Sequence, residues 1–250
     1  MRSAPVARRL IRIVCAALLG PLACTAAARP DTLYQRGMGS FHDDQMKQAE
    51  EALGAFGDKA CWGPAPDQRC REAYVTLGHA RERLGSPGAA WAAYDAALRF
   101  PPHTRDAAIN ADLDRIKGEI ADRNARRGEQ APMIILYKDE VSDEFTARSV
   151  VISVDFEPVV TKDKDAGDLH SPDFRRVYGG LVSAGEHVVM VEAVHDCRPG
   201  SGVRCARSHL RKAWPFKSEP HTPTTIEIRA YAENGDGDLG ARPALDFATH

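Results

Sequence analysis

The sequence predicts an α+β protein, with helical hairpins in its N-terminal half and a small antiparallel β-sandwich in its C-terminal half. In residues 31–127, apolar side chains recur three or four positions apart and β-branched residues are few, which is typical of helices. In residues 131–250, short segments rich in Val and Ile are separated by turn residues, which is typical of strands. The periodicity changes in the polar stretch Arg126–Gln130, which we interpret as the domain linker.

Residues 1–28 have the layout of a secretory signal peptide. Four Arg residues are followed by an apolar run, Ile13–Ala23, and by small residues that end at Ala28. The run is shorter than the roughly 20 apolar residues that a transmembrane helix needs, and no other stretch approaches that length. We therefore expect cleavage after Ala28. The mature chain would be exported to the periplasm or the outer envelope and would have no transmembrane segment.

A lipid anchor is the alternative to this cleavage. Leu22-Ala23-Cys24 resembles the end of a bacterial lipobox, in which Cys24 would be acylated. A single acyl chain gives only marginal membrane binding without a second signal. Both forms stay open, and cleavage after Ala28 is the favoured prediction.

The charge balance argues against a nucleic-acid partner. Without residues 1–28, 29 Lys and Arg residues face 35 Asp and Glu residues, a net charge of −6. Proteins that bind nucleic acids normally present a basic field. We therefore expect the partners to be of another class.

Four cysteines remain in the mature chain, and an even number in an oxidising compartment predicts disulfides. Four cysteines allow three pairings. The short separations favour Cys61 with Cys70 and Cys197 with Cys205, each closing a loop that contains Pro and Gly. Each bridge is expected to contribute about 2–3 kcal/mol to stability.

Segment 71–102 carries the strongest motif of the helical half. Gly78 and Ala90 are small where two antiparallel helices would approach closely, and Leu77 and Tyr94 would fill the space beside them. These residues resemble a tetratricopeptide repeat (TPR), a helical hairpin whose family takes up peptides or helices in a concave groove. The matching signature positions are Tyr74, Leu77, Gly78, Ala90, Tyr94, Ala97 and Pro102.

A second, fainter copy of this motif precedes it. Gly37, Ala49 and Leu53 repeat the spacing of the glycine, alanine and tyrosine in segment 71–102. Seven extra residues separate the copies, so we expect an enlarged loop over 61–70, closed by a disulfide. After the second hairpin, a single apolar stripe predicts a capping helix. Its members are Ile109, Leu113, Ile116 and Ile120.

The C-terminal half predicts seven strands, with the clearest in–out alternation at residues 225–232. They resemble the PEGA-like β-domains that bacterial envelope proteins carry after helical or TPR regions. The resemblance implies a place in the cell envelope. The expected strands are 133–137, 149–154, 158–161, 188–195, 212–217, 225–232 and 244–247.

Stretch 195–209 contains two His and two Cys residues, which are the donors of a zinc site or of a catalytic Cys–His pair. The spacing is not that of a zinc knuckle, and a catalytic cysteine needs a free thiolate that a disulfide removes. No hydrolase, nucleotide-binding or metalloprotease motif is present in the sequence. We therefore expect a non-enzymatic protein without a cofactor, metal or catalytic residue.

A basic run follows the same cysteines. With Trp214 beside it, the run predicts a surface for an anionic envelope polymer or lipid. In the other interpretation, Trp214 and Phe216 face the sandwich core and the charges only protect an edge strand. The basic residues are Arg198, Arg204, Arg207, Arg211, Lys212 and Lys217.

The main functional hypothesis is an exported scaffold or adaptor of the cell envelope, which binds a protein partner through its TPR-like helices. Tyr74, Arg81 and Trp91 are the candidate groove residues. Binding of an anionic envelope polymer or lipid by hairpin 197–217 is the alternative.

Overall fold

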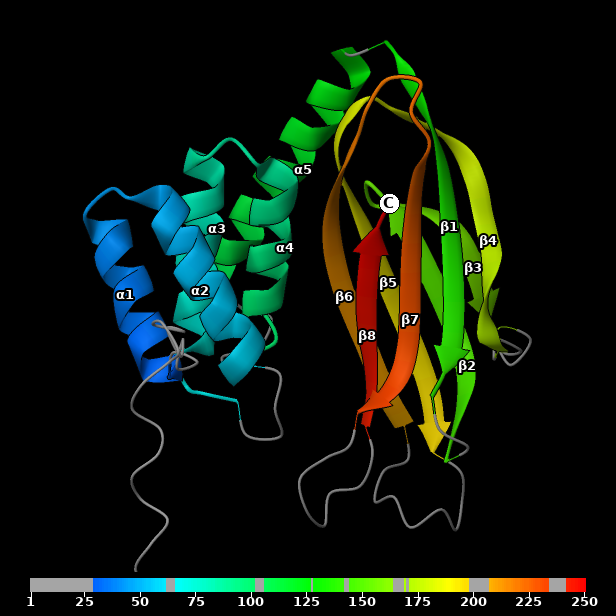
Figure 1. The fold of residues 1–250 in the computed structure, drawn as a ribbon, viewed down its shortest axis with the longest axis horizontal. Coiled ribbons are helices and arrows are strands. Elements are labelled where there is room, and N and C mark those ends of the chain that lie inside the picture. The colour runs from blue at the N-terminus through cyan, green and yellow to red at the C-terminus, as the bar shows by residue number, and fades with distance from the viewer. Residues whose placement is uncertain are drawn as a thin grey trace, which may run out of the picture.

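The computed structural model contains a five-helix region followed by two four-stranded sheets packed together, which confirms the α+β class (Figure 1). The helices lie on one side of the sandwich in Figure 1. The structure describes residues 29–61, 66–101, 106–126, 128–141, 144–163, 169, 171–197, 207–233 and 242–250.

The helices form two antiparallel pairs and a final helix. α1 packs on α2, α3 packs on α4, and the long helix α5 packs on α4. The apolar stripe of α5 is buried, as the prediction of a capping helix requires. No helix in the described part of the chain is long and apolar enough to cross a membrane. The helices are α1 Pro30–His42, α2 Met46–Ala60, α3 Cys70–Arg83, α4 Pro87–Ala97 and α5 Ala107–Arg126.

Glycines allow the close approach of the paired helices. A Cβ atom on Gly78 would lie 2.5 Å from the ring of Tyr94, and a Cβ atom on Gly37 would lie 2.6 Å from the side chain of Leu53. The small residue and its large neighbour therefore recur in both hairpins at the same spacing, as the sequence predicts.

The sandwich consists of sheet A, with strand order β4-β1-β7-β8, and sheet B, with order β3-β2-β5-β6. Every pairing is antiparallel except that of β1 with β7, which is parallel and corrects the expectation of a wholly antiparallel sandwich. The strands are β1 Gln130–Glu140, β2 Phe145–Val154, β3 Glu157–Asp163, β4 Ser171–Ser183, β5 Gly185–Cys197, β6 Arg207–Ser218, β7 Thr224–Glu233 and β8 Arg242–Thr249.

The helices and sheet B share a hydrophobic core. Nine of the eleven residues of α4 are buried, because α4 lies between α3 and α5 on one side and β5 and β6 on the other. Val188 of β5 belongs to the helical core, with Met190 and Ala213 packed against it. Gly88 brings α4 close to β5, since a Cβ atom there would lie 3.1 Å from the carbonyl oxygen of His187. The helical region thus uses the sandwich as its final layer.

Candidate functional site

An open pocket of about 410 Å³ lies between the first helices of the two hairpins. Phe41 lines it from α1, and His79, Glu82 and Arg83 line it from α3. The three α3 residues share one side of the helix because positions three and four apart lie above one another. We call this site the α1–α3 pocket.

A hydrogen-bond network fixes one wall of the pocket. The hydroxyl of Tyr94 lies 2.5 Å from Oε1 of Glu82 and 2.7 Å from Nδ1 of His79. Burial, and then the bond to Glu82, raises the pKa of Tyr94 well above its usual range, so the phenol keeps its proton. That single proton goes to Glu82, which leaves the oxygen to accept a bond from Nδ1 of His79. Arg115 of α5 completes the network at 2.7 Å from Oε2 of Glu82.

Arg83 joins the α3 side of the pocket to Phe41 of α1. The guanidinium group lies over the aromatic ring, 5.3 Å from its centroid. The same group makes an ion pair with Asp44 at 2.8 Å, and both side chains are exposed. Exposed pairs of this kind contribute little, about 0–1 kcal/mol. The cation is therefore available to another carboxylate at low cost.

Apolar and aromatic residues lie one or two helical turns from the pocket residues, with Tyr34 and Met38 before Phe41 on α1 and Val75 before His79 on α3. Met38 and Val75 are only partly buried. Tyr34, which is mostly buried, donates a hydrogen bond to Glu72 at 2.6 Å. Burial and this bond raise the pKa of Tyr34 to about 12. The face formed by α1 and α3 thus combines apolar contacts with fixed polar groups.

The three helical residues predicted to bind a partner have structural roles instead. Tyr74 is 7% exposed and stacks on Phe100, and Trp91 is 5% exposed and packs on Phe156 from the β2–β3 turn. Arg81 makes an ion pair with Glu50 and donates a hydrogen bond to the carbonyl of Ala89. Tyr74 and Trp91 therefore lie in the core rather than on an open groove, and Arg81 is engaged within the helices. Helix α4, which carries Trp91, is apolar almost all round, and this pattern indicates a helix that is covered on both sides.

Six of the TPR-like signature residues are buried in the helical core, and Pro102 lies outside the described residues. Ser86 takes the N-cap position of α4, with Pro87 after it, but its side chain makes no capping bond. The residues that line the α1–α3 pocket were not predicted. Their signal is the polar, partly exposed residues of α3 that lie beside the buried signature residues.

The described part of the basic run is largely engaged in contacts within the chain. Arg207 makes an ion pair with Asp196 at 2.8 Å, and Arg211 makes one with Asp95 of α4 at 2.9 Å. Lys212 donates to the carbonyl of Leu245 in β8. Arg198 and Arg204 lie outside the described residues.

Trp214 faces the other sheet and is partly buried there. Its ring stacks on Phe247 of β8 at 5.8 Å, and Nε1 donates to Oγ1 of Thr249 at 3.1 Å. Phe216, two positions along β6, is buried in the sandwich core. The interpretation in which Trp214 and Phe216 face the sandwich core therefore describes this strand.

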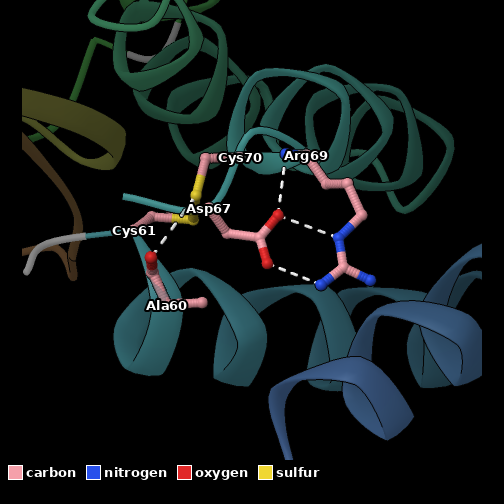
Figure 2. The surroundings of a disulfide bond; sticks show 5 residues. All are labelled: Ala60, Cys61, Asp67, Arg69 and Cys70. Carbon is pink, nitrogen blue, oxygen red and sulfur yellow. Dashed lines mark hydrogen bonds and ion pairs between the residues drawn. A yellow bond between two sulfur atoms is a disulfide. The ribbon is translucent and has the colours of Figure 1, made fainter. Parts of the chain in front are cut away.

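The Cys61–Cys70 disulfide forms as predicted and closes the connection between α2 and α3 (Figure 2). Beside it, Asp67 accepts hydrogen bonds from the backbone amide and the side chain of Arg69. The Arg69 guanidinium also lies over the rings of Tyr34 and Phe56, so it ties the connection to the first hairpin. Cys197 is disulfide-bonded as well. Its predicted partner, Cys205, lies outside the described residues, as does Cys24.

His195 is buried between the two sheets. Its Nε2 atom lies 3.3 Å from Oδ2 of Asp139 in β1, and both side chains are 1% exposed. The described residues contain no group of three or more His, Cys, Asp or Glu residues arranged to hold a metal ion. The histidine therefore joins sheet B to sheet A.

A second open pocket, of about 550 Å³, lies at the end of the sandwich, where Glu129 of the connection between α5 and β1 meets the ends of β5 and β6. Ser218 and Gly185 are among its lining residues. The Ser218 hydroxyl already donates to the carbonyl of Ser183 and accepts from the amide of Gly185. We therefore regard the α1–α3 pocket as the stronger candidate.

In comparison with known proteins, no protein-family model and no curated protein matches the chain.

Proposed function

We propose that this chain is an exported, non-enzymatic adaptor of the cell envelope that binds a protein partner through the α1–α3 pocket. The TPR-like character of the two hairpins and the PEGA-like character of the sandwich belong to this proposal. The proposal of export rests on the signal-like residues 1–28 and is supported by the Cys61–Cys70 disulfide, since stable disulfides are typical of oxidising compartments.

The observation that carries the proposal is the unequal coverage of the helices. α4 is covered on both sides, whereas the first helices of the hairpins leave Phe41, His79 and Arg83 around an open pocket. A helical scaffold that presents partly buried apolar groups beside fixed charges is suited to a peptide or helix.

The chemistry of the pocket favours a segment with an apolar anchor next to a carboxylate. The anchor would contact Phe41 and the neighbouring Met38 and Val75. The carboxylate would replace the exposed Asp44 at Arg83. Glu82 is already engaged with Tyr94 and Arg115, so it does not repel an acidic segment as a free carboxylate would.

Two matched charge reversals test this function. Arg83→Glu alters the pocket, whereas Arg36→Glu makes the same change at an exposed position of α1 outside the pocket. We expect envelope extracts to yield a protein on the wild-type chain and on Arg36→Glu, but not on Arg83→Glu. That protein, once identified by mass spectrometry and purified, should bind Arg83→Glu at least about tenfold more weakly, a loss of about 1.4 kcal/mol. Equal binding by all three chains would reject the pocket as the site.

Binding of an anionic polymer or lipid by hairpin 197–217 retains one supporting observation. Arg148 and Arg207 share the single carboxylate of Asp196, which leaves a net positive charge on this surface of sheet B. Binding of this kind should weaken steeply with salt and be lost on charge reversal of Arg148 and Arg207, with no effect of Arg83→Glu.

A further inference from the structure

The C-terminal half of β4, Val177–Ser183, is an unprotected sheet edge. β4 is an outer strand of sheet A, pairs with β1 on one side, and lies on the side of the sandwich away from the helices (Figure 1). The seven residues include no charge and no proline. A free edge presents unpaired N–H and C=O groups, and soluble proteins usually block it with charges, proline or a short strand.

The other outer strands carry such protection. β3 has only seven residues, and these include Pro158 and Lys162. β6 and β8 lie together on the opposite side, where Lys212 donates to the carbonyl of Leu245 and Trp214 bonds to Thr249. In β4 the proline and the charges all lie at the N-terminal end, from Pro172 to Arg176, so Val177–Ser183 is left without such protection.

Exposed apolar side chains accompany this edge. Leu181 is 58% exposed and Phe174 is 40% exposed. They are two of the three large hydrophobic residues that are exposed in the described part of the chain; the third, Leu84, follows α3. Exposed apolar groups on a long free edge favour association with another strand.

We propose that two copies of this chain associate by antiparallel pairing of their β4 strands about a two-fold axis at Gly180. The uncharged segment is centred on this residue, so the axis pairs the residues on either side of Gly180 with their counterparts in the second copy, as far as the register irregularity at Val177. Tyr178 then faces Val182, and Gly179 faces Leu181, each in both directions. Interfaces with two-fold symmetry use the same patch on both subunits and are the commonest form of homo-oligomer.

The two faces of the strand agree with this register. Tyr178 and Val182 pair with Ile135 and Ala131 of β1, which point into the sandwich. They would extend the apolar interior across the axis. Directly opposite side chains on one face of an antiparallel pair are the contacts that stabilise a sheet.

On the outer face, the register places a large residue beside a small one. Leu181 and Gly179 pair with Pro132 and Ile134, the outward residues of β1. Leu181 of each copy would therefore cover Gly179 of the other. The guanidinium of Arg176 now lies over this glycine, and an exposed, flexible side chain of this kind moves aside at little cost.

The charges favour a second copy over an unrelated strand. Asp173, Arg175 and Arg176 all lie before the paired segment, so the two-fold axis brings no like charges directly opposite each other. An apolar strand from another protein would have to match the same alternation of Gly, Leu, Tyr and Val. The strand itself already supplies that match.

The oligomeric state of the full mature chain with its disulfides intact tests this proposal. Sedimentation velocity should show a concentration-dependent dimer for the wild-type chain. Leu181→Lys places an ammonium group beside Arg176 of the second copy and should raise the Kd of the dimer by at least about tenfold. Leu84→Lys makes the same change at an exposed leucine of the helical region and should leave the dimer unchanged.

A cross-link tests the register. In this register, the two Leu181 side chains are diagonal neighbours, about 7–8 Å apart. A short bismaleimide reagent should therefore join two Leu181→Cys chains but not two Leu84→Cys chains. A wild-type chain that stays monomeric at all concentrations up to the sub-millimolar range overturns the proposal, even if the edge captures a foreign strand. A Leu181→Lys chain that dimerises as the wild type does also overturns it.

Discussion

The ring of Phe156 lies 4.8 Å from the ring of Trp91 and joins the tip of the β2–β3 hairpin to α4. Phe156 has φ 75° and Asp155 has φ 48°, both in the left-handed region. A two-residue connection of this kind requires positive φ at both positions, which usually selects Asn and Gly. A phenylalanine in this conformation is strained by about 1–3 kcal/mol. The packing against the helices therefore holds the turn in a form that its own sequence disfavours.

Replacement of Phe156 separates this strain from the packing. We expect Phe156→Ala to lower the free energy of unfolding by about 2 kcal/mol, because the contact with Trp91 is lost and the strained backbone is kept. Phe156→Gly loses the same ring but relieves the strain, so it should cost about 1 kcal/mol less than Phe156→Ala. Urea denaturation of both variants measures the difference. A glycine variant less stable than the alanine variant would show that the turn is not strained.

The approach of α3 to α4 should tolerate no side chain at Gly78. The Cβ atom of Gly78→Ala would lie 2.5 Å from the ring of Tyr94, a fully buried residue that has no space to retreat. We expect a loss of about 1–3 kcal/mol from overpacking. Gly118→Ala is the matched control in α5, where nothing lies within 4 Å, and it should gain about 0.5–1 kcal/mol. Thermal denaturation of the two variants should therefore move the midpoint in opposite directions.

The sequence was sufficient to predict the fold class because each half has one clear periodicity. Strand β4 was missed because its sequence, SPDFRRVYGGLVS, mixes charges and glycines instead of alternating apolar and polar residues. An edge strand has one backbone neighbour and few buried side chains, so its pattern is weak. The parallel pairing of β1 with β7 joins segments about ninety residues apart, and nothing local in either strand indicates its direction.

Candidate binding residues were harder to predict than the fold, because exposure depends on neighbours distant in the sequence. Nothing in the sequence near Trp91 shows that sheet B covers α4 and buries this side chain. Arg207 and Arg211 look like free cations until β5 and α4 bring acids against them. The small residues of the helical hairpins were predictable, since Gly78 meets a residue only sixteen positions away.

The bond between Asp67 and Arg69 predicts a specific loss of stability in acid. The hydrogen bond from the Arg69 side chain lowers the pKa of Asp67 from 3.8 to about 2. A lowered pKa contributes stability that is fully present above the unfolded value, near pH 4, and is lost as the pH falls through about 2. We expect Asp67→Asn to be about 1–2 kcal/mol less stable than the wild-type chain at pH 7 and to lose less further stability between pH 4 and 2.

Asp58→Asn, at an exposed position of α2, is the control for this pH profile. Urea denaturation at several pH values should give this control the same acid dependence as the wild-type chain. If Asp67→Asn also keeps the wild-type dependence between pH 4 and 2, the bond to Arg69 does not govern acid stability.

The ion pair between Arg211 of β6 and the buried Asp95 of α4 should contribute more to stability than ion pairs of half-exposed arginines usually do. Burial raises the pKa of Asp95, against the lowering effect of Arg211 and Arg99. Arg211→Ala would leave the buried carboxylate without its closest cation, so we expect a loss of about 2–3 kcal/mol at pH 7. Asp95→Asn should cost less, about 1–2 kcal/mol, because the half-exposed Arg211 side chain can be solvated and the amide oxygen of the asparagine can still face Arg99, whose side chain is 27% exposed. In a double-mutant cycle, adding Asp95→Asn to Arg211→Ala should therefore recover stability. The stability loss of Arg211→Ala alone should also become smaller as the pH falls, because the carboxyl group of Asp95 takes up a proton. A double variant less stable than Arg211→Ala in urea denaturation would contradict the role of this pair in joining the helices to sheet B.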